Sequence, residues 1–140
     1  TLNVINTHLG LVPREQRLQA AALIGAGWAG HPDCKGPTIL TGDFNATSMT
    51  RPYKTLTRHL ADAQRLLGLK PSVKTFPSTF PTIRIDHAFV TPDIVPTRIW
   101  APRSPLARAA SDHLPLVMDF EIRATAAAAA AATESAASKA

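Results

Sequence analysis

Short apolar blocks that end in polar residues recur along the first half of the chain. Residues 2–6 form a β-rich block that runs directly into His8. Residues 37–41 form a second block, which ends at Asp43. Both are typical of buried strands that deliver polar side chains at their carboxyl ends. Between them, apolar residues recur at helical spacing and predict an amphipathic helix over residues 14–28.

The second half of the chain predicts one more helix and three more strands. The helix is expected over residues 52–67, with a separate turn of helix over residues 60–67 as the alternative, and a proline-rich irregular loop follows over residues 70–81. Strands are expected at 84–90, 96–100 and 115–122. The order β-α-β-α-β-β-β predicts an α/β fold, with a mixed sheet of about five or six strands and two helices on one face.

The composition fits one folded domain followed by a tail. Of the 140 residues, 45% are hydrophobic and 18% are charged, which suits a single domain over residues 1–123. Residues 124–140 are alanine-rich and of low complexity, so we expect a disordered tail or a frayed helix there. The single cysteine, Cys34, excludes an internal disulfide and a thiolate zinc site, and we assign it no role.

The first residues form a strand-like sequence without an initiator methionine. We therefore expect the chain to begin in the middle of a domain. A targeting signal upstream would lie outside this sequence, so the location in the cell stays unknown, with the cytoplasm as the default.

Charge favours anionic partners without choosing among them. The formal net charge is +5, from 15 Lys and Arg against 10 Asp and Glu. Nucleic acid, phospholipid headgroups and small phosphate esters all fit this balance. No run of five or more basic residues occurs, so a solvated basic surface is an equal alternative.

Polar groups cluster at the ends or starts of four predicted strands. They lie in Asn6-Thr7-His8, Gly42-Asp43-Phe44-Asn45, Arg84-Ile85-Asp86 and Ser111-Asp112-His113. Any one of these is more often a turn or a cap than a site. Because a buried sheet gathers the ends of its strands along one edge, the four segments are expected to converge there.

These segments, in this order, resemble motifs of the endonuclease/exonuclease/phosphatase superfamily of metal-dependent phosphoesterases. The resemblance covers residues 1–122 and rests above all on Gly-Asp-Phe-Asn at 42–45 followed by Ser-Asp-His-x-Pro at 111–115. It implies the C-terminal half of a four-layer αββα sandwich, so residues 1–123 would be a partial domain. One face of the sheet would then be unusually apolar, because it normally packs on the N-terminal half.

The chemistry of phosphate-ester hydrolysis suggests roles for four residues. Asp43 can orient and deprotonate a water molecule, and Asn45 can hold that water or the phosphate without adding charge. His113 can donate a proton or pair with a phosphate oxygen. Asp86 can fix the tautomer of His113 and raise its pKa, and the resemblance assigns the same Asp86–His113 pair.

The resemblance and strand alternation add further candidates. By resemblance, His8 is a second phosphate-contacting imidazole and Asp112 is an auxiliary metal ligand beside Asp43, for Mg²⁺ with Mn²⁺ as the alternative. Arg84 would share the face of Asp86 and either contact the substrate or close an ion pair. His87 would point to the opposite face as a structural residue.

Two functions remain open at this stage. In the first, the intact protein is a Mg²⁺-dependent phosphoesterase, and this chain alone is inactive and marginally soluble because it lacks the N-terminal metal ligands. In the second, the chain is a non-catalytic basic fragment that binds phosphate-rich partners or docks onto a separate N-terminal half of the same domain.

Overall fold

The computed structural model describes residues 1–123. The alanine-rich tail predicted from residue 124 onward lies outside the described residues. Within the described range, no helix has the length and apolar character needed to cross a bilayer.

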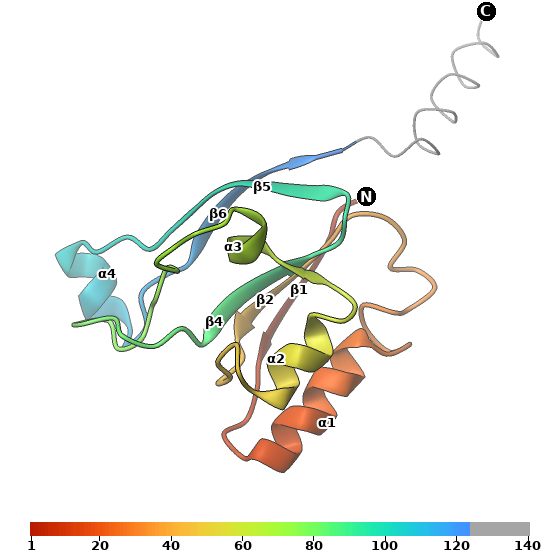
Figure 1. Ribbon diagram of the computed structural model, residues 1–140, viewed down its shortest axis with the longest axis horizontal. Coiled ribbons are helices and arrows are strands. Elements are labelled where there is room, and N and C mark those ends of the chain that lie inside the picture. The colour runs from red at the N-terminus through yellow and green to blue at the C-terminus, as the bar shows by residue number, and fades with distance from the viewer. Residues whose placement is uncertain (124–140) are drawn as a thin grey trace, which may run out of the picture.

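The central element is a four-stranded mixed sheet (Figure 1). It consists of β1 (Asn3–His8), β2 (Thr38–Asp43), β4 (Asp86–Val90) and β3 (Ala61–Asp62), in the order β1-β2-β4-β3. β1 and β2 run parallel, whereas β4 is antiparallel to both of its neighbours. The α/β class and the mixed sheet agree with the sequence prediction.

The last two strands form a separate antiparallel hairpin. β5 (Ile94–Trp100) pairs with β6 (Val117–Ile122) and with no strand of the first sheet in the described part of the chain. The prediction of a single sheet of five or six strands is therefore wrong. Ile94 and Ile99 of β5 share one core cluster with Val90 of β4, so the hairpin packs against the first sheet as a second layer.

Four helices connect these strands. α1 (Pro13–Ile24) ends earlier than predicted, because the glycine-rich segment that follows is unfavourable in a helix. The helix predicted over residues 52–67 is divided by β3 into α2 (Arg51–Leu56) and α3 (Ala63–Leu66). α4 (Pro105–Ala110) was not predicted, and none of its residues is buried.

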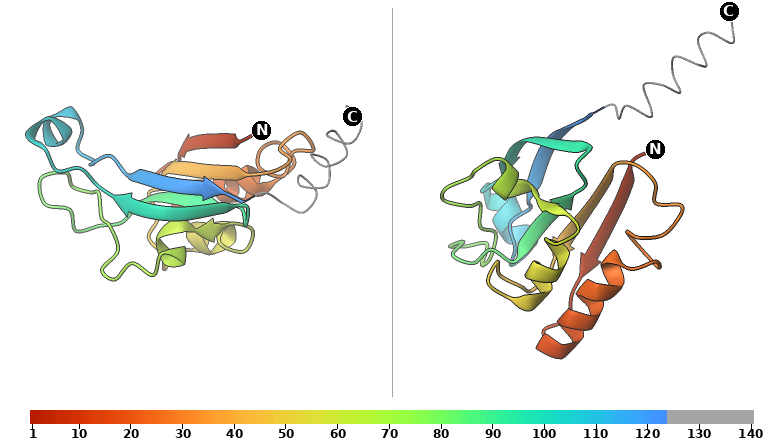
Figure 2. Two further views of the ribbon diagram at one scale, coloured as in Figure 1. Left: turned by 90° about the horizontal axis from the view of Figure 1, so that it is seen from above. Right: turned by 45° about the vertical axis from the view of Figure 1, so that its right-hand side comes forward.

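The two faces of the sheet are covered differently. α1 and α2 lie on one face, as the right-hand view in Figure 2 shows, and pack over Ile5, Leu40 and Phe89. The hairpin packs on the other face at β4. On the edge strand β1, Val4 remains 61% exposed. The hairpin therefore covers the β4 side of this face, and the broad apolar surface expected from the half-domain interpretation stays a prediction.

A buried polar cluster joins β3 to the start of β4. The Nη2 atom of Arg84 lies 2.6 Å from Asp62 Oδ1, and the hydroxyl of Tyr53 donates to Asp62 Oδ2 at 2.5 Å. Burial alone raises the pKa of Asp62, but the hydrogen bonds from Arg84 and Tyr53 outweigh it and lower this pKa. Of the two roles considered for Arg84, the structure has the ion pair with Asp62.

His87 packs in the core beside this cluster, among Phe44, Tyr53 and Phe89. Its Nε2 lies 2.7 Å from the carbonyl oxygen of Ala46, which can only accept, so Nε2 carries the proton. Burial, aided by the charge of Arg84, lowers the pKa of His87 to about 4. The imidazole is therefore neutral near pH 7, in line with the structural role predicted from strand alternation.

This lowered pKa predicts a loss of stability in mild acid. An unfolded histidine takes up a proton near pH ~6.5, whereas folded His87 does so only near pH 4. The free energy of unfolding should therefore fall as the pH drops from ~6.5 towards 4. In urea unfolding at pH 7 and pH 5, His87→Gln, which keeps a donor for Ala46, should lose less stability than the wild type. Equal losses in both proteins would contradict the prediction, and His59→Gln, at an exposed histidine, is the control.

Candidate active site

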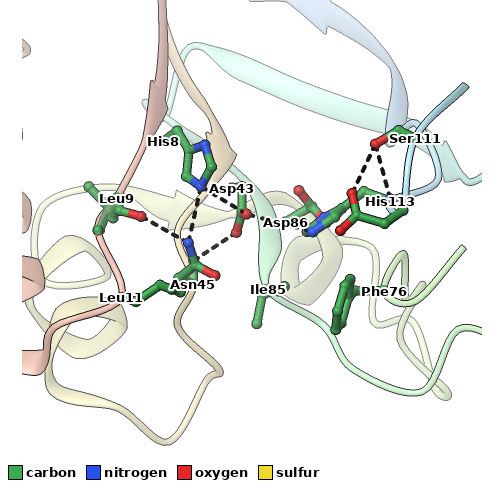
Figure 3. A pocket seen from close by; sticks show the side chains of 12 residues that line it. His8, Leu9, Leu11, Asp43, Asn45, Phe76, Ile85, Asp86, Ser111 and His113 are labelled. Atoms are coloured by element: carbon green, nitrogen blue, oxygen red, sulfur yellow. Dashed lines mark hydrogen bonds and ion pairs between the residues drawn. The ribbon is translucent and has the colours of Figure 1, made fainter.

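Three functional side chains lie in one row across the sheet. His8 of β1 is the register partner of Asp43 of β2, and Asp43 is the register partner of Asp86 of β4. All three therefore share one face of the sheet, the face opposite α1 and α2 (Figure 3). Three of the four predicted segments thus converge through strand register alone.

Gly42 permits this register. Its backbone has φ of +142°, a conformation that residues with a Cβ atom rarely adopt. A Cβ atom built at this position would lie only 1.8 Å from the carbonyl oxygen of Thr7 on β1. Glycine is therefore required before Asp43, because any side chain would separate β1 from β2 just where His8 meets Asp43.

Asn45 is held in a turn that also points its amide towards the site. Its φ is 46°, and its backbone N–H donates to Asp43 Oδ1 at 2.8 Å. Its Nδ2 donates to the carbonyl oxygen of Leu9 at 2.9 Å and lies 3.1 Å from His8 Nε2. Gln16 of α1 donates to the Asn45 carbonyl at 3.0 Å. The Asx-turn and the functional interpretation of Asp43 and Asn45 are therefore compatible.

His113 reaches the same row from the loop before β6. Its Nδ1 lies 2.8 Å from Asp86 Oδ2, and its Nε2 lies 3.7 Å from Asp43 Oδ2. Partial burial lowers the pKa of His113, but the hydrogen bond and charge of Asp86, with the charges of Asp43 and Asp112, outweigh it and raise this pKa. The structure thus brings together the predicted Asp86–His113 pair, with Nε2 of the imidazole directed towards Asp43.

These residues line an open cavity of about 680 Å³. Its walls also include the apolar side chains of Leu9, Leu11 and Ile85. Asp112 lines the cavity beside His113, as the sequence prediction requires of a site residue. No lysine or arginine is among the described residues that line it.

A cluster able to hold a metal ion lies in this cavity. Asp43, Asp86 and His113 each offer a ligand atom, and these atoms lie within 4.8 Å of one another. Asp112 is outside this cluster, so the predicted ligand pair of Asp43 and Asp112 is not brought together as a cluster in the described structure. Because His113 Nδ1 is already bonded to Asp86, the oxygens of Asp43 are the donors best suited to a hard cation.

Sequence reasoning missed the segment that supports the Asp86–His113 pair. Buried Thr75 donates from its hydroxyl to Asp86 Oδ2, and its carbonyl accepts from the N–H of Leu114 at 2.9 Å. The ring of Phe76 lies 4.8 Å, between centroids, from that of His113. The proline-rich pattern predicted a loop here but gave no sign that it contacts the site. The only available signal was the pair Thr75-Phe76 before Asp86.

This contact predicts a specific loss on removing the Thr75 hydroxyl. Thr75→Val keeps the shape but deprives a partly buried carboxylate of a donor, which should lower the free energy of unfolding by about 2 kcal/mol. Thr75→Ser keeps the hydroxyl and should cost less than Thr75→Val. Urea unfolding of both variants measures the difference. If the serine variant were the less stable of the two, the hydroxyl would not be the important group.

Comparison with known proteins gives a consistent assignment. A family model described as "Endonuclease/Exonuclease/phosphatase family" matches residues 2–113. Among curated proteins, the chain is similar to the uncharacterized protein YbhP of Escherichia coli K12, with 28% identity over 127 residues. This match covers 86% of the chain and 47% of the relative. The chain therefore spans about half the length of the curated relatives it matches.

Solved structures show the same fold over a similar share. An endonuclease/exonuclease/phosphatase from Bacteroides vulgatus matches with a TM-score of 0.68 and 26% identity, over 83% of this chain and 48% of that one. The mannosyl-6-phosphatase Bt3783 of Bacteroides thetaiotaomicron matches with a TM-score of 0.69 and 21% identity, over 85% and 51% of the two chains. The second likeness shows the fold alone.

Proposed function

The chain belongs to the endonuclease/exonuclease/phosphatase family, and on this basis we propose that its cavity hydrolyses a phosphate ester with the help of a divalent cation. Family membership supports a phosphoesterase-type function in general. The metal and the roles of individual residues are our proposal, and so is the activity of the whole protein, because this chain spans about half of its relatives.

The observation that carries the proposal is the charge of the cavity. Asp43, Asp86 and Asp112 line it, and no lysine or arginine is among its described lining residues. An anionic phosphate would be repelled by these carboxylates unless a cation screened them. A divalent cation bound together with the substrate supplies that positive charge and fits the acidic donor set.

The protein's own groups divide the remaining work. Asp43 orients the attacking water and accepts its proton, and the Asn45 amide holds the water or a phosphate oxygen. His113 donates a proton from Nε2 to the leaving oxygen. Its raised pKa keeps the ring protonated to a higher pH than that of an ordinary histidine. Asp86 holds the other ring nitrogen and so directs Nε2 towards the reacting atoms.

His8 and Asp112 support this centre from its two sides. His8 Nε2 lies 3.3 Å from Asp43 Oδ2, so a protonated His8 can pair with the carboxylate or with a phosphate oxygen. Asp43 would be the principal ligand that this chain supplies to the cation, and Asp112, which lines the cavity outside the cluster of Asp43, Asp86 and His113, would be an auxiliary ligand. Mg²⁺ is the proposed ion and Mn²⁺ the alternative, because both prefer oxygen ligands. A cation held there would supply positive charge against the negative charge that develops on the phosphoryl oxygens.

The first test uses the longer protein that contains this chain. Hydrolysis of bis(p-nitrophenyl) phosphate and of p-nitrophenyl phosphate should stop in EDTA and return with Mg²⁺. Asp43→Asn should lower the rate at least ~100-fold, because it removes the proton acceptor. Asp33→Asn, at an exposed loop position, is the matched control and should leave the rate unchanged. Activity that survives both EDTA and Asp43→Asn would refute the proposed mechanism.

The second test compares that protein with residues 1–140 alone. We propose that the rest of the protein supplies further metal ligands, as the family resemblance implies. The isolated chain should therefore hydrolyse both substrates at least ~100-fold more slowly, since metal stabilisation of the transition state is worth several kcal/mol. Equal rates for a monomeric 1–140 chain, checked by size-exclusion chromatography, would show that these residues hold the metal unaided.

A further inference from the structure

Two long segments of the chain contain no acidic residue. Residues 63–85 and 94–111 together carry seven of the 15 lysines and arginines and none of the 10 aspartates and glutamates. The sequence alone suggested scattered charge, because these segments are separated by β4. Two segments without acidic residues can form one basic surface only if the fold brings them together.

The fold does bring them together, beside α4 and away from α1. They enclose a cleft of about 420 Å³, lined on one side by Pro71 to Lys74 and Pro81 and on the other by Ile99 to Ala101 and Arg103. A hydrogen bond also joins the two segments outside the cleft, where Arg108 Nη1 donates to the carbonyl oxygen of Thr79 at 3.3 Å. Figure 1 shows the segment after α3 and the segment leading into α4 at the same end of the molecule. We call this feature the basic cleft.

The cations of the basic cleft are available to a ligand. Lys74 and Arg103 line it, and neither forms an ion pair with any residue in the range 1–123. Trp100 supplies an aromatic wall, and the guanidinium carbon of Arg98 lies 4.3 Å from the centroid of its ring. Two cations and one aromatic ring thus line the same cleft.

The basic cleft is also close to the candidate active site. Lys74 lines the cleft and Phe76 lines the catalytic cavity, where it packs against His113. Lys74 and Phe76 are two positions apart, so their Cα atoms lie at most ~7 Å from each other. The cleft and the catalytic cavity are therefore neighbours along one short segment. An extended ligand can therefore occupy both sites at once, whereas a small phosphate ester can fill only one.

We propose that the basic cleft binds a single polynucleotide strand, with phosphates on Lys74 and Arg103 and a base against the ring of Trp100. Positive charge combined with aromatic surfaces is the chemistry by which proteins hold single-stranded nucleic acid. A lipid surface would need an apolar protrusion more than a concave cleft of this kind. The further statement that the bound strand continues into the catalytic cavity as substrate rests on the proposed function.

The test measures binding of a fluorescein-labelled, mixed-sequence 12-nucleotide single-stranded DNA to the longer protein, in EDTA, by fluorescence anisotropy. Lys74→Gln/Arg103→Gln should weaken binding at least ~10-fold at low salt. The plot of the logarithm of the binding constant against the logarithm of the salt concentration has a negative slope. The double variant should reduce the magnitude of this slope by about 1.4, because each lost phosphate contact on a single strand contributes ~0.7. Arg17→Gln/Arg58→Gln removes the same charge from exposed positions outside the cleft and should change binding less than twofold.

Three results would overturn the proposal. The two double variants could bind DNA equally well, or inorganic phosphate could compete with the oligonucleotide at equal concentration. The protein could also bind vesicles of phosphatidylcholine and phosphatidylglycerol (3:1) but not DNA. Since binding is measured without metal, DNA binding without hydrolysis of the nitrophenyl substrates would refute the proposed function alone. Hydrolysis without DNA binding would refute only the basic cleft.

Discussion

The close approach of β1 and β2 at Gly42 is the constraint that brings His8 beside Asp43 in the candidate active site. Because nothing separates Gly42 from Thr7, the two parallel strands stay paired to their ends, and His8 meets Asp43. β4 then adds Asp86 to the same row through its own register with β2. The row of His8, Asp43 and Asp86 is therefore set by strand pairing, and His113 joins it from the loop before β6 through its hydrogen bond with Asp86.

β4 has a second role, because its residues alternate between two different environments. Asp86 faces the cavity, whereas its neighbour His87 is buried in the core beneath α2. Just before β4, the ion pair of Arg84 with Asp62 ties this region to β3. A buried ion pair contributes little net stability, but loss of one partner is costly, so it holds the strand in one position. The buried His87 and the ion pair of Arg84 thus hold the backbone of β4 at Asp86, whose carboxylate stays available to His113.

The sequence predicted the parts of this protein that depend on local pattern and left out those that depend on packing. Buried strands appear as apolar blocks, so β1, β2 and β4 and their polar ends, including Asp43 and Asp86, could be recognised. β3 is two residues long and α4 buries nothing, so neither has a hydrophobic period to detect. The support of Asp86 by Thr75 could not be predicted either, because it is a contact across 11 residues of irregular chain.

The sequence separation of the residues in the cavity has a consequence for how the protein folds. Asn45 contacts His8 across 37 residues, and His113 contacts Asp86 across 27. Contacts of this kind stabilise the chain only after long loops have closed, and loop closure costs conformational entropy. Folding is therefore slower than in proteins with mainly local contacts. During synthesis, β1, β2 and β4 can pair before residue 113 leaves the ribosome. The acid–base pair is therefore the last contact of the centre that can form, because His113 is synthesised after all its partners.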